Sequence, residues 1–154
     1  MKIIHRDLKF QNILLSRKPN PALAATSDDS PSKSKNSNEF DIDLRIIDFG
    51  IFGSTQSINP EKIQAGSLKY MSPELLIGRT ESTAGIDVWS LGIILHGLVT
   101  GNVPFRSSSK EELKKMIIEQ EVKLNSKDIT ISNECKDLIK RMLDKNPSKR
   151  ITIR

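Results

Sequence analysis

The chain has 154 residues, of which 36% are apolar and 28% charged, a length and composition typical of one globular domain with a hydrophobic core. The net charge of +5 does not indicate nucleic-acid binding, because the 12 Lys and Arg residues between positions 110 and 154 are interleaved with 8 Asp and Glu residues on expected helix surfaces. The single cysteine, Cys135, excludes an intramolecular disulfide, and no signal peptide or membrane span is expected.

The chain begins with a polar loop and two short strands. The loop carries HRDLKFQN at residues 5–12, and RIIDFG follows at residues 45–50. Apolar runs at residues 12–15 and 44–47, bounded by polar and glycine signals, predict the two strands of a β-hairpin.

The segment between the two strands is polar. Residues 17–39 contain three prolines and five serines, and Leu23 is their one strongly apolar side chain. Such a segment cannot bury enough surface to offset the entropy lost on ordering. We therefore expect a disordered insertion at about residues 17–40.

The second half of the chain is predicted to be helical. Residues 85–101 are apolar nearly all round, which indicates a helix buried at the centre of a domain. A capping box, Ser109 with Glu112, opens a predicted helix over 109–120, and Ser132 caps another over 132–143. The residues expected on the buried faces of these two helices are Leu113, Met116, Ile117, Cys135, Leu138, Ile139, Met142 and Leu143.

Three side chains of the two early motifs suggest a chemistry. Phosphoryl transfer from ATP needs carboxylate or amide oxygens for Mg²⁺ and a group that accepts the proton of the attacking hydroxyl. Asp7, Asn12 and Asp48 supply such oxygens, and a hairpin would bring them together. In a purely structural interpretation of either motif alone, Asp7 and Asn12 cap turns and Asp48 ends a strand.

Taken together, five motifs resemble the protein kinase family. HRDLKFQN fits the catalytic loop H-R-D-L-x-x-x-N, and the triplet at 48–50 fits the metal-binding D-F-G. GSLKYMSPE at 66–74 is similar to the end of an activation segment, although serine stands where the usual motif has alanine. DVWSLGIILHGLVTGNVPF at 87–105 resembles the central helix, and NPSKRIT at 146–152 the closing arginine motif.

The resemblance implies a mainly α fold with a short β-hairpin, namely the larger, C-terminal lobe of a serine/threonine protein kinase domain spanning residues 1–154. The motifs resemble most the calcium/calmodulin-dependent and energy-sensing kinases. The implied reaction transfers phosphate from ATP, with Mg²⁺, to serine or threonine hydroxyls of a protein substrate.

The resemblance also assigns roles to residues of the catalytic centre. Asp7 would be the hydroxyl-orienting base, and Lys9 would contact the transferring phosphate and favour serine and threonine over tyrosine. Asn12 and Asp48 would hold Mg²⁺, and Leu14 would line the floor of the adenine pocket.

Further residues would support the centre. Arg6 would face the activation segment, ready to pair with a phosphate there. Ser67 would steady the catalytic loop, and Asp87 would accept its backbone N–H groups. Glu74 would pair with Arg150 in a buried ion pair.

The remaining motif positions are expected to be structural. Phe49 and Gly50 complete the D-F-G triplet, and His5 is expected to pack beneath Phe49. Trp89 and His96 are expected in the core.

The chain also departs from the family pattern. No glycine-rich phosphate loop and no strand lysine with a partner glutamate occur in it, so we expect a chain without the smaller, ATP-binding lobe. Ile63 stands where many kinases carry a phosphorylated threonine. The alternative to a catalytic lobe is a truncated pseudokinase that binds partners without catalysis. The expected partners are a protein substrate and an upstream kinase or regulatory domain, and binding to nucleic acid or a membrane is not expected. The expected location is the cytoplasm.

Overall fold

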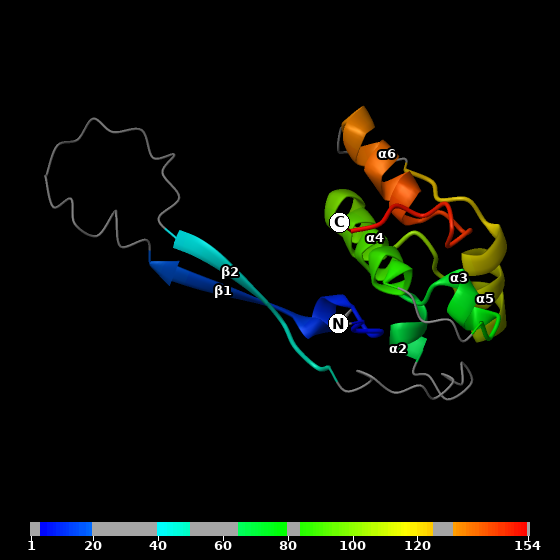
Figure 1. Cartoon of the computed structure of the whole chain (residues 1–154), viewed down its shortest axis with the longest axis horizontal. Helices are drawn as coiled ribbons and strands as arrows, with labels where there is room; N and C mark the ends of the chain where they lie inside the picture. Colours follow the sequence, from blue (N-terminus) through cyan, green and yellow to red (C-terminus); the bar gives the residue numbers. More distant parts are fainter. Residues whose placement is uncertain (1–3, 20–39, 50–64, 80–83, 125–130, 154) are drawn as a thin grey trace, which may run out of the picture. The chain divides into compact units, whose positions relative to one another are not determined.

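The computed structural model describes residues 4–19, 40–49, 65–79, 84–124 and 131–153 (Figure 1). The chain forms two compact units, one from Met1–Phe10 with Asp48–Arg154 and the other from Gln11–Ile47. The described helical elements are η1 (Phe10–Asn12, a 3₁₀ helix), α2 (Ala65–Leu68), α3 (Pro73–Leu76), α4 (Gly85–Thr100), α5 (Lys110–Glu119) and α6 (Asn133–Met142). The two described strands are β1 (Ile13–Pro19) and β2 (Phe40–Ile46).

The smaller unit is built on the predicted hairpin, but its strands are longer than predicted. β1 and β2 are antiparallel, with Ile13 opposite Ile46 and Pro19 opposite Phe40. Residues 17–19, expected to be disordered, are therefore paired strand residues, and this part of the prediction is wrong. Residues 20–39, the rest of the predicted insertion, lie outside the described residues.

Electrostatic contacts accompany this extra pairing. On one face of the hairpin the Asp43 carboxylate lies 3.5 Å from Lys18 Nζ and 3.2 Å from Arg45 Nε. The hydrogen bond from Arg45 is the main factor that lowers the pKa of Asp43. Backbone pairing and one cross-strand charge pair, Lys18 with Asp43, thus accompany the longer ladder without burial of apolar surface.

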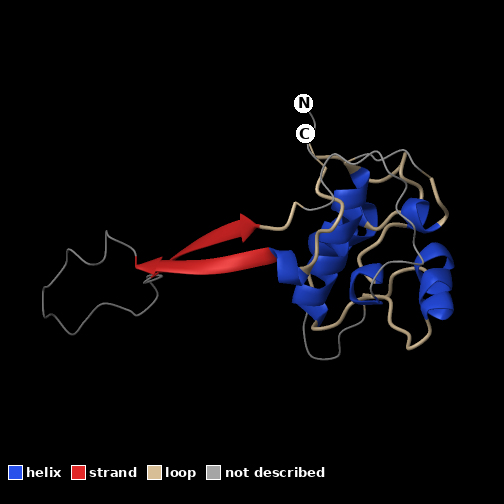
Figure 2. Ribbon diagram, turned by 90° about the horizontal axis from the view of Figure 1, so that it is seen from below, coloured by secondary structure: helices blue, strands red, loops and turns tan. Residues whose placement is uncertain are grey.

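The larger unit is organised around α4, the longest of the described helices, which is labelled in Figure 1. Figure 2 shows the described helices in blue. Trp89 and Ile93 on this helix have no exposed surface. α6 packs against α4 where α4 has a glycine: a Cβ atom at Gly92 would lie 2.8 Å from Leu143 Cδ2 and 2.9 Å from Met142 Cβ. The absence of a side chain at Gly92 therefore sets how closely the chain at the end of α6 approaches α4.

The predicted helix starts are confirmed. Ser109 Oγ accepts a hydrogen bond from the N–H of Glu112 at 3.3 Å, and Ser132 Oγ accepts one from the N–H of Cys135 at 3.2 Å. In a complete capping box the Glu112 carboxylate would accept the backbone N–H of Ser109. Here Ser107 Oγ accepts that N–H and itself donates to the Glu112 carboxylate.

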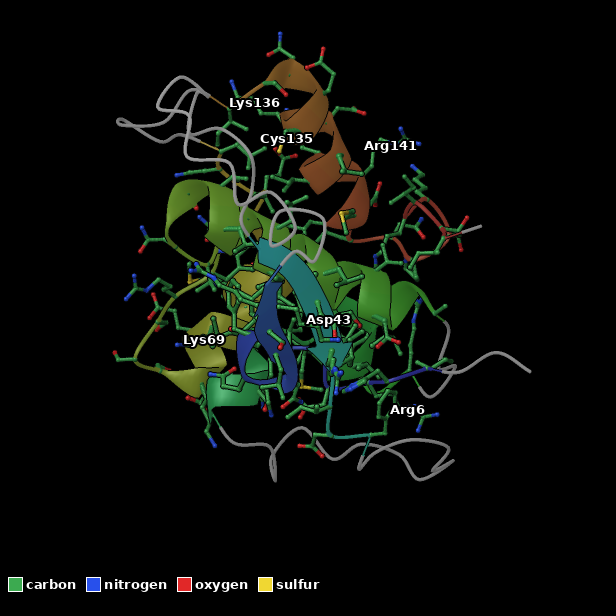
Figure 3. The ribbon with its side chains drawn as sticks, turned by 90° about the vertical axis from the view of Figure 1, so that its left-hand side faces the viewer. Arg6, Asp43, Lys69, Cys135, Lys136 and Arg141 are labelled. Atoms are coloured by element: carbon green, nitrogen blue, oxygen red, sulfur yellow. The ribbon has the colours of Figure 1, made fainter. Side chains whose placement is uncertain are left out.

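The predicted buried faces need correction at four positions. Leu138 is 40% exposed, and Met116, Cys135 (labelled in Figure 3) and Met142 are only partly buried. Ile139 and Leu143 are buried as predicted. A helix that contacts its neighbour along one stripe buries residues four apart and turns the residue just before outward. α4 likewise exposes 67% of Leu98 near its C-terminus, so it is not buried on every side.

No described helix is long and apolar enough to cross a membrane. The most apolar helix, α4, has 16 residues, fewer than the roughly 20 that span a bilayer.

Candidate active site

The HRD loop is attached to the central helix by one carboxylate. Asp87, in the first turn of α4, accepts the backbone N–H of His5 at 2.8 Å and that of Arg6 at 2.9 Å. His5 is buried, and its ring centroid lies 4.7 Å from that of Phe49. The expected packing of His5 against Phe49 is confirmed, and two backbone N–H groups of the loop are held by a side chain of the central helix.

A lysine connects the loop to the segment that follows the D-F-G motif. Lys9 Nζ lies 2.6 Å from Asp7 Oδ2 and donates to Ser67 Oγ at 3.1 Å. The side chains of Asp7 and Lys9 are each 19% exposed, so the pair lies at the surface but is shielded from most of the solvent. The structure therefore brings together three of the residues that the sequence predicts in the centre: Asp7, Lys9 and Ser67.

Two motif residues have a left-handed backbone. Arg6 has φ 68° and Asp48 has φ 64°, a region that residues other than glycine occupy rarely. Each such residue costs on the order of 1 kcal/mol or more, and strain of this kind concentrates at functional sites. Nothing in the sequence signals this strain, because neither residue is a glycine.

The predicted metal and adenine residues belong to different units. Asn12 and Leu14 lie in the hairpin unit, and Asp48 lies in the helical unit. Asn12 is buried, and its backbone carbonyl accepts the N–H of Ile47 at 2.9 Å. Leu14 is 48% exposed. The convergence of Asn12 with Asp7 and Asp48 stays a prediction, and Gly50 and Ile63 lie outside the described residues.

The predicted ion pair between Glu74 and Arg150 is present and buried. Arg150 Nη1 and Nη2 donate to the two Glu74 oxygens at 2.6 and 2.9 Å. Burial alone would raise the pKa of Glu74, but the hydrogen bonds and charge of Arg150 outweigh it and lower the pKa. Arg150 also donates to the carbonyls of Gly85 and Asp144, so all three nitrogens of its guanidinium have acceptors.

Lys145 has contacts that the sequence does not predict, because it lies in the basic stretch KNPSKR at residues 145–150. Its Nζ lies 4.9 Å from the ring centroid of Trp89 and 4.3 Å from that of Phe105, and it donates to the carbonyl of Ile117. Burial, and then the charge of Arg150, lower the pKa of Lys145 to about 8. Spacing along the chain gives no sign of this contact, because its partners lie at least 28 residues away.

Comparison with known proteins decides the family. The family described as "Protein kinase domain" matches residues 1–154. This chain belongs to the protein kinase family.

Relatives of this kinase domain are serine/threonine kinases, which include SNF-related and calcium-dependent enzymes. The chain is 37% identical over 151 residues to Serine/threonine-protein kinase kin-29 of Caenorhabditis elegans, covering 98% of this chain and 15% of that protein. It is 31% identical over 153 residues to the human SNF-related serine/threonine-protein kinase, with coverages of 99% and 17%. It is 35% identical over 151 residues to Calcium-dependent protein kinase 21 of Oryza sativa subsp. japonica, with coverages of 97% and 23%.

The kinase chain thus spans less than a quarter of the length of these relatives. The match confirms the serine/threonine kinase family that the motifs resemble. Protein kinases are transferases that use ATP and Mg²⁺. The family match does not test single positions, so the roles of Asp7, Lys9, Asn12 and Asp48 stay predictions.

Proposed function

We propose that residues 1–154 form the larger lobe of a serine/threonine protein kinase domain, from the catalytic loop to the closing arginine motif. In this proposal the lobe transfers the terminal phosphate of ATP to serine or threonine hydroxyls of a protein, in the cytoplasm. The observation that carries it is the connected set of Asp87, the HRD loop, Lys9 and Ser67, because it fixes a carboxylate and an ammonium at one point of the surface.

Asp7 and Lys9 act on the two reacting partners. The Asp7 carboxylate orients the attacking hydroxyl and accepts its proton, and Lys9 stabilises negative charge on the transferring phosphate. Because Lys9 already lies 2.6 Å from Asp7, one loop supplies both groups without rearrangement of its backbone. This preorganisation matters because positioning and electrostatics account for most of the catalysis of phosphoryl transfer.

Asn12 and Asp48 fit the cofactor by their chemistry. Mg²⁺ takes oxygen ligands and is commonly held by one or two carboxylates together with substrate phosphates. Asp48 supplies a carboxylate and Asn12 an amide oxygen, and within the described part of the chain no cluster of three His, Cys, Asp or Glu side chains forms a complete metal site. ATP–Mg²⁺ supplies the phosphoryl group and neutralises the charge on it, and Leu14 would contact the adenine.

The groups that cover the phosphates are not among these 154 residues. A kinase needs a glycine-rich loop and a strand lysine with its glutamate partner, and the sequence contains none of them. We therefore expect the isolated chain to show no measurable transfer. Further residues of the natural polypeptide, or another chain, would have to supply these groups, as they would the contacts of an upstream kinase or regulatory domain.

A radiolabelled-phosphate assay tests the proposal. We expect the natural polypeptide that contains residues 1–154 to phosphorylate a generic serine substrate. Asp7→Asn and Asp48→Asn should each remove this activity, and Lys115→Gln, an exposed change on α5, should leave it unchanged. Robust transfer by the isolated 154 residues contradicts the expected need for the missing groups. A folded but inactive natural polypeptide contradicts the proposal and favours the pseudokinase, a binding module without catalysis.

A further inference from the structure

An aromatic side chain occupies an open position of the catalytic-loop motif. The pattern H-R-D-L-x-x-x-N leaves three positions unassigned, and Phe10 is the middle one of the three. Phe10 belongs to the helical unit and is 38% exposed, so most of its surface is covered by the chain. Its ring is therefore packed against partners in that unit.

One partner is a position of α4 that has no side chain. A Cβ atom at Gly97 would lie 3.1 Å from Phe10 Cε2 and 3.2 Å from Phe10 Cζ. Both distances are shorter than an ordinary contact between carbon atoms, so a larger residue at position 97 would displace the ring. Glycine is less favourable than alanine inside a helix, and the close approach of another group is a physical reason for its presence. Gly97 thus leaves the space against α4 that the Phe10 ring occupies.

The other partner is Tyr70, in the segment that follows the D-F-G motif. The rings of Phe10 and Tyr70 meet edge to face, with centroids 6.4 Å apart and an angle of 78° between the ring planes. This is a preferred arrangement of aromatic pairs. Burial raises the pKa of the Tyr70 hydroxyl, and a hydrogen bond with the Phe10 backbone partly offsets this effect. The side chain and the backbone of Phe10 therefore both contact Tyr70.

These contacts lie next to the hydrogen bond between Lys9 and Ser67. Phe10 follows Lys9 directly in the chain, and the Tyr70 N–H donates to the carbonyl of Ser67 at 3.0 Å. Ser90, on α4, donates to the Tyr70 carbonyl at 2.9 Å. Both sides of the hydrogen bond are thus connected to α4, one through the Phe10 ring and the other through the Tyr70 carbonyl.

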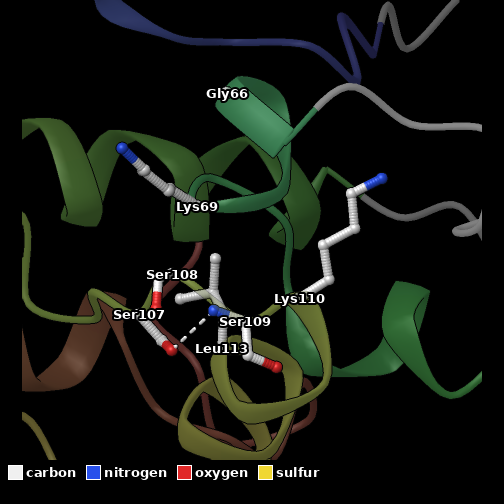
Figure 4. Close-up of a pocket in the computed structure, with 7 residues that line it drawn as sticks. All are labelled: Gly66, Lys69, Ser107, Ser108, Ser109, Lys110 and Leu113. Atoms are coloured by element: carbon white, nitrogen blue, oxygen red, sulfur yellow. Dashed lines mark hydrogen bonds between the residues drawn. The ribbon is translucent and has the colours of Figure 1, made fainter.

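The segment that carries Ser67 also borders a cavity. Figure 4 shows Gly66 and Lys69 at a cavity of about 200 Å³, which is lined in addition by residues 107–110 and Leu113. Close-packed protein interiors contain few voids larger than a water molecule, so packing around this segment is incomplete. The position of Ser67 therefore depends on the contacts of the segment with the loop and with α4.

We propose that Phe10 is a positioning residue for Lys9: its ring, fixed against α4, keeps the Lys9 ammonium beside the Asp7 carboxylate. This inference rests on the proposed kinase function, in which Lys9 stabilises charge on the transferring phosphate. Phe10 acts through Lys9 and forms no contact with the reacting atoms. Phosphoryl transfer relies on positioning, and a displacement of about 1 Å can reduce a rate on the order of 100-fold.

Nuclear magnetic relaxation of the 154-residue chain tests the positioning without ATP. Backbone order parameters of about 0.85 indicate a rigid residue and values below about 0.6 a flexible one. We expect the Lys9 amide to be rigid in the parent chain and to become flexible in Phe10→Ala. Phe10→Leu, which keeps an apolar contact with Gly97, should leave Lys9 rigid, as should Leu98→Ala on the exposed side of α4.

Circular dichroism verifies that each variant is folded. A Lys9 amide that is as rigid in Phe10→Ala as in the parent chain overturns the inference.

Steady-state kinetics of the natural polypeptide that contains residues 1–154 give a second test. Phe10→Ala should lower kcat about tenfold and leave the KM for ATP within about twofold, because the loss falls on the transition state. Gly97→Val, which displaces the ring, should lower kcat similarly. The double variant should be no slower than Phe10→Ala alone, since both changes remove the same contact. Phe10→Leu should retain most of the parental kcat.

The outcomes separate this inference from the proposed function. Parental kcat in Phe10→Ala, or additive losses in the double variant, overturns the inference and leaves the proposed kinase activity intact. A flexible Lys9 in Phe10→Ala combined with an inactive natural polypeptide overturns only the proposed phosphoryl transfer.

Discussion

Single charged side chains fix the position of the candidate site. Asp87 holds the backbone at His5 and Arg6, and Lys9 joins Asp7 to Ser67. These contacts are hydrogen bonds with a charged partner, which are stronger than neutral ones. The cost of a left-handed backbone at Arg6 is therefore offset locally, because the N–H of this residue donates to a carboxylate.

At this scale we predict that Glu74→Ala lowers the free energy of unfolding by about 3 to 5 kcal/mol, because it leaves the buried guanidinium of Arg150 without its carboxylate. Chemical denaturation of the variant and the parent chain measures the change. Glu121→Ala, a change at an exposed glutamate, is the control and should alter stability by less than about 0.5 kcal/mol. Unchanged stability of Glu74→Ala would remove this claim.

The ion pair between Glu74 and Arg150 should also make the free energy of unfolding depend on pH in acid. The pKa of Glu74 is lowered in the folded chain, so the pair stabilises the fold above the ordinary pKa of glutamate and loses this effect as pH falls through the folded value. The difference in unfolding free energy between the parent chain and Glu74→Ala should therefore shrink in acid. A difference that stays constant with pH argues against an ionised Glu74.

Lys145 should make the free energy of unfolding depend on pH in the alkaline range. Its pKa is about 8 in the folded chain and 10.5 in its ordinary state, so the folded chain binds fewer protons between these values. Stability should rise as pH increases from about 8 toward 10.5, relative to the variant Lys145→Met. Denaturation of both chains across this range measures the difference, and the exposed Lys149→Met provides the control. A difference independent of pH would show that Lys145 titrates normally.

At the scale of elements, the helices were predictable because their signals are local. Ser109 and Ser132 cap α5 and α6, and the predicted and observed ends of α4 differ by at most one residue. The length of the hairpin was not predictable from hydrophobic pattern, because residues 17–19 pair through backbone and charged groups instead of burial. The exposure of Leu138 depends on where α6 meets α4, which no local signal encodes.

The contact between α4 and α6 gives a prediction at this scale. Gly92→Ala places a methyl group within 3 Å of Leu143 and Met142, so one helix must shift. We expect a loss of about 1 to 3 kcal/mol in unfolding free energy, typical of overpacking. Leu98→Ala, on the exposed side of α4, is the control and should have little effect. Gly92→Ala at parent stability would show that the two helices separate readily.

At the scale of the whole molecule, the family was predictable because five motifs occur in the order of a kinase domain, and the match over residues 1–154 confirms it. The roles of the catalytic residues stay predictions, and the structure adds contacts and backbone detail that the sequence does not show. Asp7, Lys9 and Ser67 come together as contacts, while the strain at Asp48 and the packing of Lys145 follow from three-dimensional surroundings.

The central claim is that Asp7, Asn12 and Asp48 serve one metal–phosphate site, although Asp48 follows Asn12 by 36 residues. Paramagnetic relaxation tests it, with Mn²⁺ and ATP added to the isotopically labelled chain, because partial occupancy is enough to broaden nearby signals. We expect comparable broadening at all three residues, which corresponds to carboxylate and amide groups within about 10 Å of one another. Broadening at Asp7 and Asn12 with none at Asp48 would contradict it.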